Sequence, residues 1–158
     1  ANDIELDNEN IWIATNEGVV KFTNGAFQYY KQPDYNYPSF IVSSTAKDMI
    51  GNIWFCHKNS SESRNGISYF DGTQFVNFFP GSSLNSVNHI SVDMFNNKWV
   101  STNEGLVRLS SNNNILIYNR ANSLISSNVI SSSAIDKNGI LWVTNSSNGL
   151  NKFKFNSN

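Results

Sequence analysis

The feature that most constrains this chain is the even spacing of its four tryptophans. They lie at Trp12, Trp54, Trp99 and Trp142, so successive tryptophans are 42, 45 and 43 residues apart. The surrounding residues repeat as well: NIWIAT (10–15), NIWFCH (52–57), NKWVST (97–102) and ILWVTN (140–145). A fixed period of this length indicates an array of similar units, each burying its hydrophobic face against its neighbours.

Each unit is predicted to contain four short strands. The first ends near an aspartate, and the tryptophan strand follows a tight turn such as 136–139, whose Asp, Asn and Gly residues favour turns. The third strand begins at a glycine, as in GVVKF (18–22) and its counterparts at 66–70, 105–109 and 149–153. The fourth strands are AFQYY (26–30), QFVNFF (74–79) and ILIYN (115–119). No segment has a sustained helical period, so we expect almost no helix.

This pattern favours the blades of a β-propeller over a sandwich or small barrel, because only stacked blades need the same bulky residue at every period. We predict an all-β fold of about four antiparallel blades, the last incomplete, in one partial or small propeller. The approximate blades are 1–38, 39–82, 83–124 and 125–158, with the four tryptophans as core between them. Three arrangements stay open: part of a larger propeller, a small four-bladed ring, or a ring of about eight blades from two chains. A fragment or truncated gene product that self-associates is favoured.

The repeat resembles the two-component regulator propeller repeat. Its pattern is most complete in the second unit, at Asp48, Gly51, Asn52, Ile53, Trp54, Asn65, Gly66, Ile67, Phe70, Asp71, Gly72, Phe75 and Phe78. The resemblance implies a periplasmic or extracellular sensor propeller of a hybrid histidine kinase, of the kind found in Bacteroidetes. Many such receptors respond to glycan fragments, so a glycan fragment or another small polar molecule is the ligand it implies.

The composition argues against some classes of binding partner. A net charge of -1, with 15% charged residues, argues against nucleic-acid binding, which usually needs a basic surplus. No stretch approaches the ~20 apolar residues of a membrane span, so direct membrane insertion is not expected. The N-terminal residues 1–5 show no secretory signal pattern. Cys56 is the only cysteine, so it is expected to be a packed thiol without a disulfide partner in the chain.

Few residues are candidates for catalysis or metal binding. His57 and His89 are the only histidines, and neither is spaced with carboxylates as a metal or acid–base site would require. The repeated aspartates, Asp48, Asp93 and Asp136, are predicted to cap turns. Streptogramin-lyase-type propellers have a similar tryptophan strand followed by a Glu, but His57, Thr15, Thr102 and Asn145 occupy that place here. We therefore predict no catalytic residue, no metal and no cofactor.

One end of the second blade is the best candidate for binding. Two unusual loops, 32–38 and 58–65, are expected at the same end of the sheet stack. Loops of this kind often carry function on β-scaffolds. The predicted ligand-binding residues are Tyr35, Tyr37, His57, Lys58 and Arg64; the alternative is a surface insertion without function. The favoured function is non-catalytic ligand sensing, ahead of a structural or protein-interaction propeller, with a lyase-type enzyme third.

Overall fold

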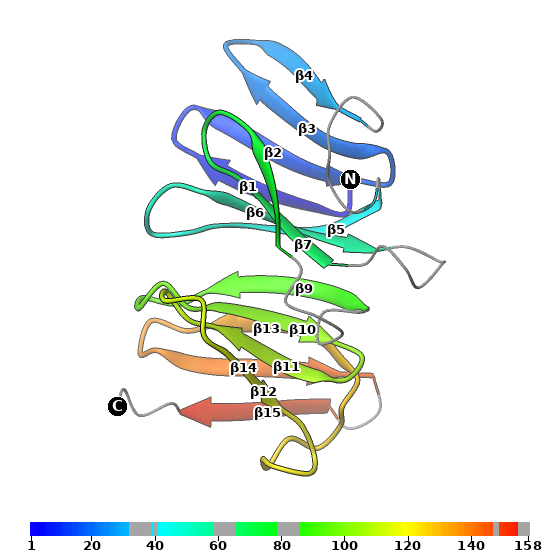
Figure 1. Ribbon diagram of the computed structural model, residues 1–158, viewed down its shortest axis with the longest axis vertical. Coiled ribbons are helices and arrows are strands. Elements are labelled where there is room, and N and C mark those ends of the chain that lie inside the picture. Colours follow the sequence, from blue (N-terminus) through cyan, green and yellow to red (C-terminus); the bar gives the residue numbers. More distant parts are fainter. Residues whose placement is uncertain (32–38, 40, 59–65, 79–85, 147–148, 155–158) are drawn as a thin grey trace.

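The computed structural model describes residues 1–31, 39, 41–58, 66–78, 86–146 and 149–154, and these contain strands but no helix. The strands form four separate antiparallel sheets, hereafter blades 1 to 4, each built from consecutive strands (Figure 1). Blade 1 contains β1 (Asp3–Asp7), β2 (Asn10–Thr15), β3 (Gly18–Thr23) and β4 (Ala26–Tyr30). Blade 2 contains β5 (Ile41–Lys47), β6 (Ile53–Lys58), β7 (Gly66–Phe70) and β8 (Phe75–Phe78). Blade 3 contains β9 (Val87–Val92), β10 (Lys98–Thr102), β11 (Gly105–Leu109) and β12 (Ile115–Tyr118). Blade 4 contains β13 (Ile130–Ile135), β14 (Ile140–Asn145) and β15 (Gly149–Lys154).

The blades stack face to face in chain order, from blade 1 at the top of Figure 1 to blade 4 at the bottom. Their first strands are neighbours, because β1 contacts β5, β5 contacts β9 and β9 contacts β13. The turns between first and second strands lie at one end of the stack, on the left of the view, and the turns between second and third strands of blades 1 and 3 lie at the other (Figure 1). The prediction of propeller blades with an incomplete fourth is confirmed for the described residues.

Each tryptophan points from its own blade toward the next one. Trp12 contacts Phe55 and Phe70 of blade 2, with ring centroids 5.9 and 5.1 Å apart. Trp54 packs into the core that blade 3 completes, and Trp99 packs against residues of blade 4. These three side chains are at most 4% exposed, whereas Trp142 is only partly buried at the end of the stack. The predicted core role therefore fits the first three, and Trp142 has no following blade among the described residues.

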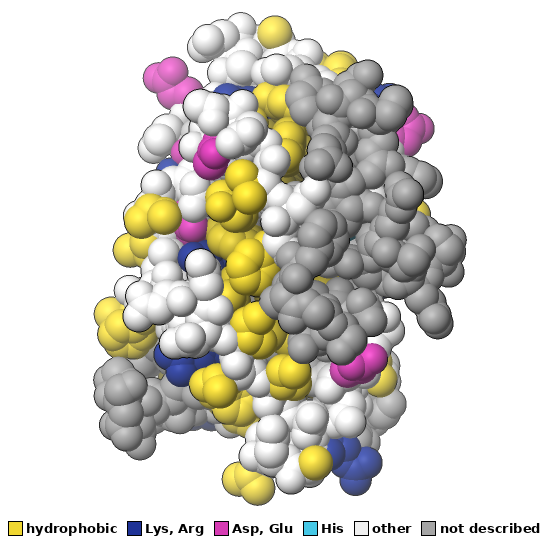
Figure 2. Space-filling model, in the orientation of Figure 1, with side chains coloured by type: hydrophobic (Ala, Val, Ile, Leu, Met, Phe, Trp, Pro, Cys, Tyr) yellow, Lys and Arg dark blue, Asp and Glu magenta, His cyan; other side chains and the backbone are white. Residues whose placement is uncertain are grey.

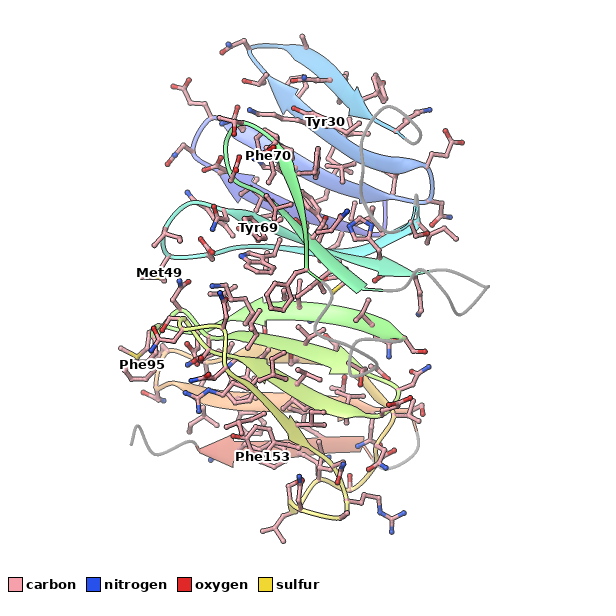
Figure 3. All side chains as sticks on the ribbon, viewed as in Figure 1. Tyr30, Met49, Tyr69, Phe70, Phe95 and Phe153 are labelled. Carbon is pink, nitrogen blue, oxygen red and sulfur yellow. The ribbon has the colours of Figure 1, made fainter. Side chains whose placement is uncertain are left out.

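The sticks in Figure 3 show this packing at the top of the molecule, where Tyr30 of blade 1 and Phe70 of blade 2 lie between the two sheets. Tyr30 is stacked on Trp12 with ring centroids 5.8 Å apart, and it lies 6.0 Å from Phe70. Fourth strands supply an aromatic partner to the other buried tryptophans in the same way, through Phe78 and Tyr118. Aromatic contacts of this kind add to the free energy gained from burying the rings.

The aspartates before the tryptophans organise the first turn of each of the last three blades. Asp93 accepts backbone N–H bonds from Phe95 and Asn97 on one oxygen, each at 2.9 Å. Its other oxygen accepts the Trp99 indole N–H at 2.9 Å and the Asn97 amide at 2.7 Å. Asp48 and Asp136 bind their own turns and tryptophans similarly. The predicted turn-capping role is confirmed, and each carboxylate also fixes the indole of its own blade; blade 3 packs on the Trp54 indole and blade 4 on that of Trp99.

Asp48 carries a further interaction, because Lys98 of blade 3 reaches it across the interface. The Lys98 Nζ lies 3.4 Å from Asp48 Oδ2 and 5.0 Å from the centre of the Trp54 ring, and both side chains are buried. Burial alone would raise the pKa of Asp48, but hydrogen bonds from Trp54 and Asn52 and the Lys98 charge outweigh it and lower the pKa. The ion pair thus joins blades 2 and 3 beside the tryptophan.

Polar side chains on the first strands add a second set of links between blades. Three residues accept a hydrogen bond from a backbone N–H of the following blade: Asp3 from Thr45 at 3.0 Å, Ser44 from Ile90 at 3.3 Å and His89 from Ser133 at 3.4 Å. The bond to His89 requires an unprotonated Nδ1, and burial lowers the pKa of this histidine. His89 therefore has a structural partner in blade 4.

Candidate functional site

His57, one of the predicted ligand residues, lies inside blade 2 rather than on its surface. Its side chain is fully buried, with Nδ1 2.7 Å from the Ser39 carbonyl oxygen and Nε2 2.7 Å from the Ser68 hydroxyl. Since a carbonyl can only accept, Nδ1 carries the proton and Nε2 accepts from Ser68. Burial lowers the pKa of His57 to about 4, so the ring is neutral at pH 7.

His57 takes the place of a hydrogen-bonding residue at the strand end. In blades 1 and 3 this position is held by Thr15 and Thr102, whose hydroxyls donate to the carbonyls of Gly18 and Gly105 at 2.8 Å. His57 instead joins its strand to the residue that precedes β5 and to β7. It contributes a polar bond to the interior, and a ligand contact for it stays a prediction.

Lys58 follows His57 on β6 and is exposed. Its backbone carbonyl accepts a hydrogen bond from the Ser39 hydroxyl at 2.9 Å, so the segment entering blade 2 lies beside the end of β6. The loops 32–38 and 59–65 themselves lie outside the described residues, so their meeting at one end of the stack stays a prediction. Tyr35, Tyr37 and Arg64 lie outside the described residues, and their place in a site stays a prediction.

Lys58 borders a shallow hollow of about 310 Å³ at this end of the stack, which we call the rim hollow. Its other lining residues come from blades 3 and 4: Asn88, Asn103, Val129 and Ser131. The amide of Asn88 donates to Asn103 Oδ1 at 2.9 Å and to the Ile130 carbonyl oxygen at 2.7 Å, which holds both asparagines in place. The hollow is thus bordered by one ammonium group together with amide and hydroxyl groups. These groups suit a neutral polar ligand, or a ligand with a hydrogen-bond acceptor near Lys58.

The asparagines of the rim hollow were not predicted from the sequence, although a signal for them exists. In blade 1 the same arrangement occurs, because Asn2 donates to Asn16 Oδ1 and to the Val42 carbonyl oxygen, both at 2.8 Å. Asn16 and Asn103 each lie four positions after their tryptophan. Aligning the units on their tryptophans would have revealed this repeated polar pair.

A second cavity, of about 360 Å³, lies between blades 3 and 4 at the opposite end of the stack. It is lined by Asp93, Phe95, Arg108, Asn112 and Asn114, among others. The Arg108 guanidinium carbon lies 5.8 Å from the centre of the Trp99 ring. The carboxylate of Asp93 is occupied by its own turn, so this cavity combines amide, hydroxyl and guanidinium groups with apolar side chains such as Ile135 and Leu141.

The described residues offer little for catalysis. They contain no group of three or more His, Cys, Asp or Glu that could hold a metal ion. Burial raises the pKa of the Cys56 thiol, which is fully buried, as expected for a packed cysteine. Within the described part of the chain no catalytic arrangement is evident, and no helix there could cross a membrane.

Solved structures contain the same arrangement of blades. The extracellular domain of the putative hybrid two-component system BT3049 from B. thetaiotaomicron is 25% identical over 89% of this chain, with a TM-score of 0.74. The extracellular domain of BT4673 from the same organism is 18% identical over 97% of this chain, with a TM-score of 0.80. Virginiamycin B lyase from Staphylococcus aureus is 16% identical over 98%, with a TM-score of 0.67. The predicted resemblance to sensor propellers of hybrid two-component systems is confirmed.

This chain spans 20% and 23% of the two extracellular domains and 55% of the lyase. No protein-family model matches it, and no curated protein matches it in sequence. The likeness to the lyase and to BT4673 concerns the fold alone.

Proposed function

We propose that this chain is a ligand-binding, non-catalytic part of a periplasmic or extracellular sensor propeller in a two-component system. The observation that carries the proposal is its match, over 89% of its length, to the extracellular domain of a putative hybrid two-component system. The lyase likeness supports an enzyme less well, because the described residues gather no metal-binding or acid–base cluster.

The rim hollow is the proposed binding site. It combines an exposed lysine with fixed asparagines, and Lys58 directly precedes in sequence the loop predicted to bind through Arg64. Only 15% of the residues are charged, so the ligand would contact neutral hydrogen-bonding groups rather than experience a strong electrostatic field. These features favour a glycan fragment or another small polar molecule, with the Lys58 ammonium donating to one of its oxygens.

A binding screen tests this proposal. A panel of neutral and acidic oligosaccharides is added to the chain, and thermal stability is followed, because a ligand that binds only the folded state raises the midpoint. Affinity for any hit is then measured by calorimetry for the wild type, Asn103→Ala and Asn112→Ala. Asn112 is an exposed asparagine on the cavity at the opposite end, so it is the matched control.

We expect Asn103→Ala to weaken binding about tenfold, as for loss of one hydrogen bond of about 1.4 kcal/mol, and Asn112→Ala to leave it unchanged. If the affinity for a ligand from the panel depends on Asn112 but not on Asn103, the binding site is the cavity at the opposite end of the stack and not the rim hollow. The absence of binding across the panel would contradict ligand sensing, and turnover of any compound would contradict the non-catalytic role.

A protein-interaction propeller is the second candidate, favoured by one exposed apolar patch. Met49 and Ile50 on the first turn of blade 2 are 67% and 76% exposed, and Met94 and Phe95 on that of blade 3 are 68% and 57% exposed. The turns are joined, because the Met49 N–H donates to Asn96 Oδ1 at 2.9 Å. Met49 and Phe95 project from the same side of the stack in Figure 3. Exposed apolar groups gathered in this way are typical of contact surfaces.

A further inference from the structure

The cavity between blades 3 and 4 lies at the interface where a regular pattern of ion pairs between blades is interrupted. In the two preceding interfaces, a lysine of the later blade reaches the aspartate that precedes the tryptophan of the earlier blade. The Lys47 Nζ lies 2.7 Å from Asp7 Oδ1, and the Lys98 Nζ lies 3.4 Å from Asp48 Oδ2. Among the described residues, Asp93 of blade 3 has no ion-pair partner.

Both places in blade 4 that could provide this lysine are apolar. Lys47 directly precedes the aspartate of its own blade, and the corresponding residue of blade 4 is Ile135. Lys98 directly precedes the tryptophan of its own blade, and the corresponding residue of blade 4 is Leu141. Ile135 and Leu141 both line the cavity of about 360 Å³, together with Asp93. The cavity therefore occurs at the interface that lacks the lysine.

The walls of this cavity come from two consecutive blades of the chain. Its lining residues in blade 4 belong to β13, β14 and the turn between them, and not to β15, which is the edge strand of that sheet. The cavity therefore does not depend on what lies beyond the edge of blade 4. Two of its lining residues, Met94 and Phe95, are 68% and 57% exposed, so it opens to the surface beside them. Figure 2 shows apolar side chains at the surface on the left of the view, the end of the stack where these turns lie.

The hydrogen bonds within its own turn leave the Asp93 carboxylate able to pair with an ammonium group. Its Oδ2 accepts the Trp99 indole N–H at 2.9 Å and the Asn97 amide at 2.7 Å. Asp48 Oδ2 accepts the same two kinds of bond, at 2.8 and 3.1 Å, and still has the Lys98 ammonium 3.4 Å away. The chain thus already contains one carboxylate that combines these turn bonds with a cation.

Arg108, the cationic residue that lines the cavity, does not take the place of the lysine. Its guanidinium carbon lies 5.8 Å from the centre of the Trp99 ring, and it forms no ion pair with Asp93 among the described residues. The residue that aligns with Arg108 in blade 1 is Lys21, which lies 5.1 Å from the ring of its own tryptophan while Lys47 pairs with the aspartate. One cation at the indole and a second at the carboxylate therefore occur together in that interface.

We propose that the cavity between blades 3 and 4 binds a primary ammonium group on a short alkyl stem, with the ammonium at the Asp93 carboxylate and the stem beside Ile135 and Leu141. The ligand thus takes the place of the lysine that blades 2 and 3 carry in their own sequence. A volume of about 360 Å³ lies within the range of small-molecule sites, about 300–1,000 Å³. This site lies at the opposite end of the stack from the rim hollow, so it is independent of the proposed function.

A nuclear magnetic resonance titration of the chain with n-butylammonium, followed through the indole N–H resonance of Trp99, tests the site. The control ligand is n-butanol, which has a similar size and no charge. We expect the amine to shift this resonance in a saturable way and the alcohol to bind about tenfold or more weakly, as for loss of a charged hydrogen bond. The amide resonance of Asn103, at the rim hollow, should stay fixed. A blocked peptide with one lysine is titrated in parallel: tighter binding than n-butylammonium identifies a peptide lysine as the source of the ammonium, and weaker binding identifies a free amine.

Substitutions at Ile135 make the test specific to the proposed geometry. Ile135→Lys provides the lysine from the chain itself, at the place that Lys47 holds in blade 2, so it should abolish the shift caused by the amine. Ile135→Met, with a side chain of similar size and no charge, should keep it. Circular dichroism confirms that each variant is folded, and Leu141→Lys, placed as Lys98 is in blade 3, makes the same test if Ile135→Lys does not fold. Amine binding by the lysine variant as tight as by the wild type would overturn the proposal, as would a wild type that binds neither compound or binds both equally.

Discussion

Replacing His57 by asparagine should remove much of the loss of stability that this chain suffers in acid. The imidazole is fully buried and neutral, with its pKa lowered by burial from 6.5 to about 4. The unfolded chain therefore binds a proton on His57 at a higher pH than the folded chain does. The stability contributed by the neutral ring is present above pH 6.5 and is lost as the pH falls toward 4.

The size of this effect follows from the two pKa values. Each unit of difference corresponds to 1.36 kcal/mol, so between pH 7 and pH 4 the single histidine should lower the free energy of unfolding by about 3 kcal/mol. Asparagine occupies the equivalent position in blade 4, as Asn145, so the substitution has a precedent in the same chain. His89, whose pKa is also lowered, is present in both proteins and cancels in the comparison.

Urea unfolding at pH 7, 5.5 and 4, at one fixed protein concentration, measures the effect. The wild type should lose about 3 kcal/mol more than His57→Asn over this range, after allowing for the variant's own stability at pH 7. Equal losses in the two proteins would refute the reasoning. A proton resonance of His57 that titrates near pH 6.5 in the folded chain would refute its cause.

Two further pairs of substitutions test the packing. Trp99→Ala should cost about 3–5 kcal/mol, because the ring is 1% exposed between blades, whereas Trp142→Ala should cost less than half of that, because Trp142 is only partly buried. Equal costs in urea unfolding would contradict the direction in which the tryptophans point. Gly105→Ala should destabilise by about 2–3 kcal/mol, because the residue has a φ of 140° and a new Cβ would lie 2.5 Å from a backbone carbonyl oxygen. Gly25→Ala, with a φ of 77° and nothing within 4 Å, should cost about 1 kcal/mol, and thermal unfolding of both variants would expose any reversal of this order.

The sequence predicted the fold well because its strongest signal is repeated four times. Each unit has a tryptophan at a fixed period, with an aspartate before it and a glycine after it. Each of these residues has a role in its own strand or turn, so the strands and turns could be predicted to within a few residues. Trp142 has the same sequence context as the other three tryptophans. Its side chain is only partly buried, because no blade among the described residues follows blade 4.

The candidate site was harder to predict, since it depends on which blade ends meet. Lys58 is predicted from its place beside an enlarged loop, and it does border the rim hollow. Asn88, Asn103 and Ser131 reach that hollow from two other blades. The same loop predicts His57 as a ligand residue, yet its side chain points into the interior of blade 2. Alternation along a strand sends neighbouring residues to opposite faces, and the sequence alone did not decide which of the pair faces solvent.

The most direct test of the sensing role is a nuclear magnetic resonance titration of the labelled chain with the tightest oligosaccharide found in the screen. We predict that the amide resonances of Lys58, Asn88 and Asn103 shift in a saturable way, that those of Asn112 and Asn114 stay fixed, and that the oligosaccharide is recovered unchanged. Shifts confined to the opposite end of the stack, or an altered oligosaccharide, would contradict a non-catalytic sensor that binds its ligand at the rim hollow.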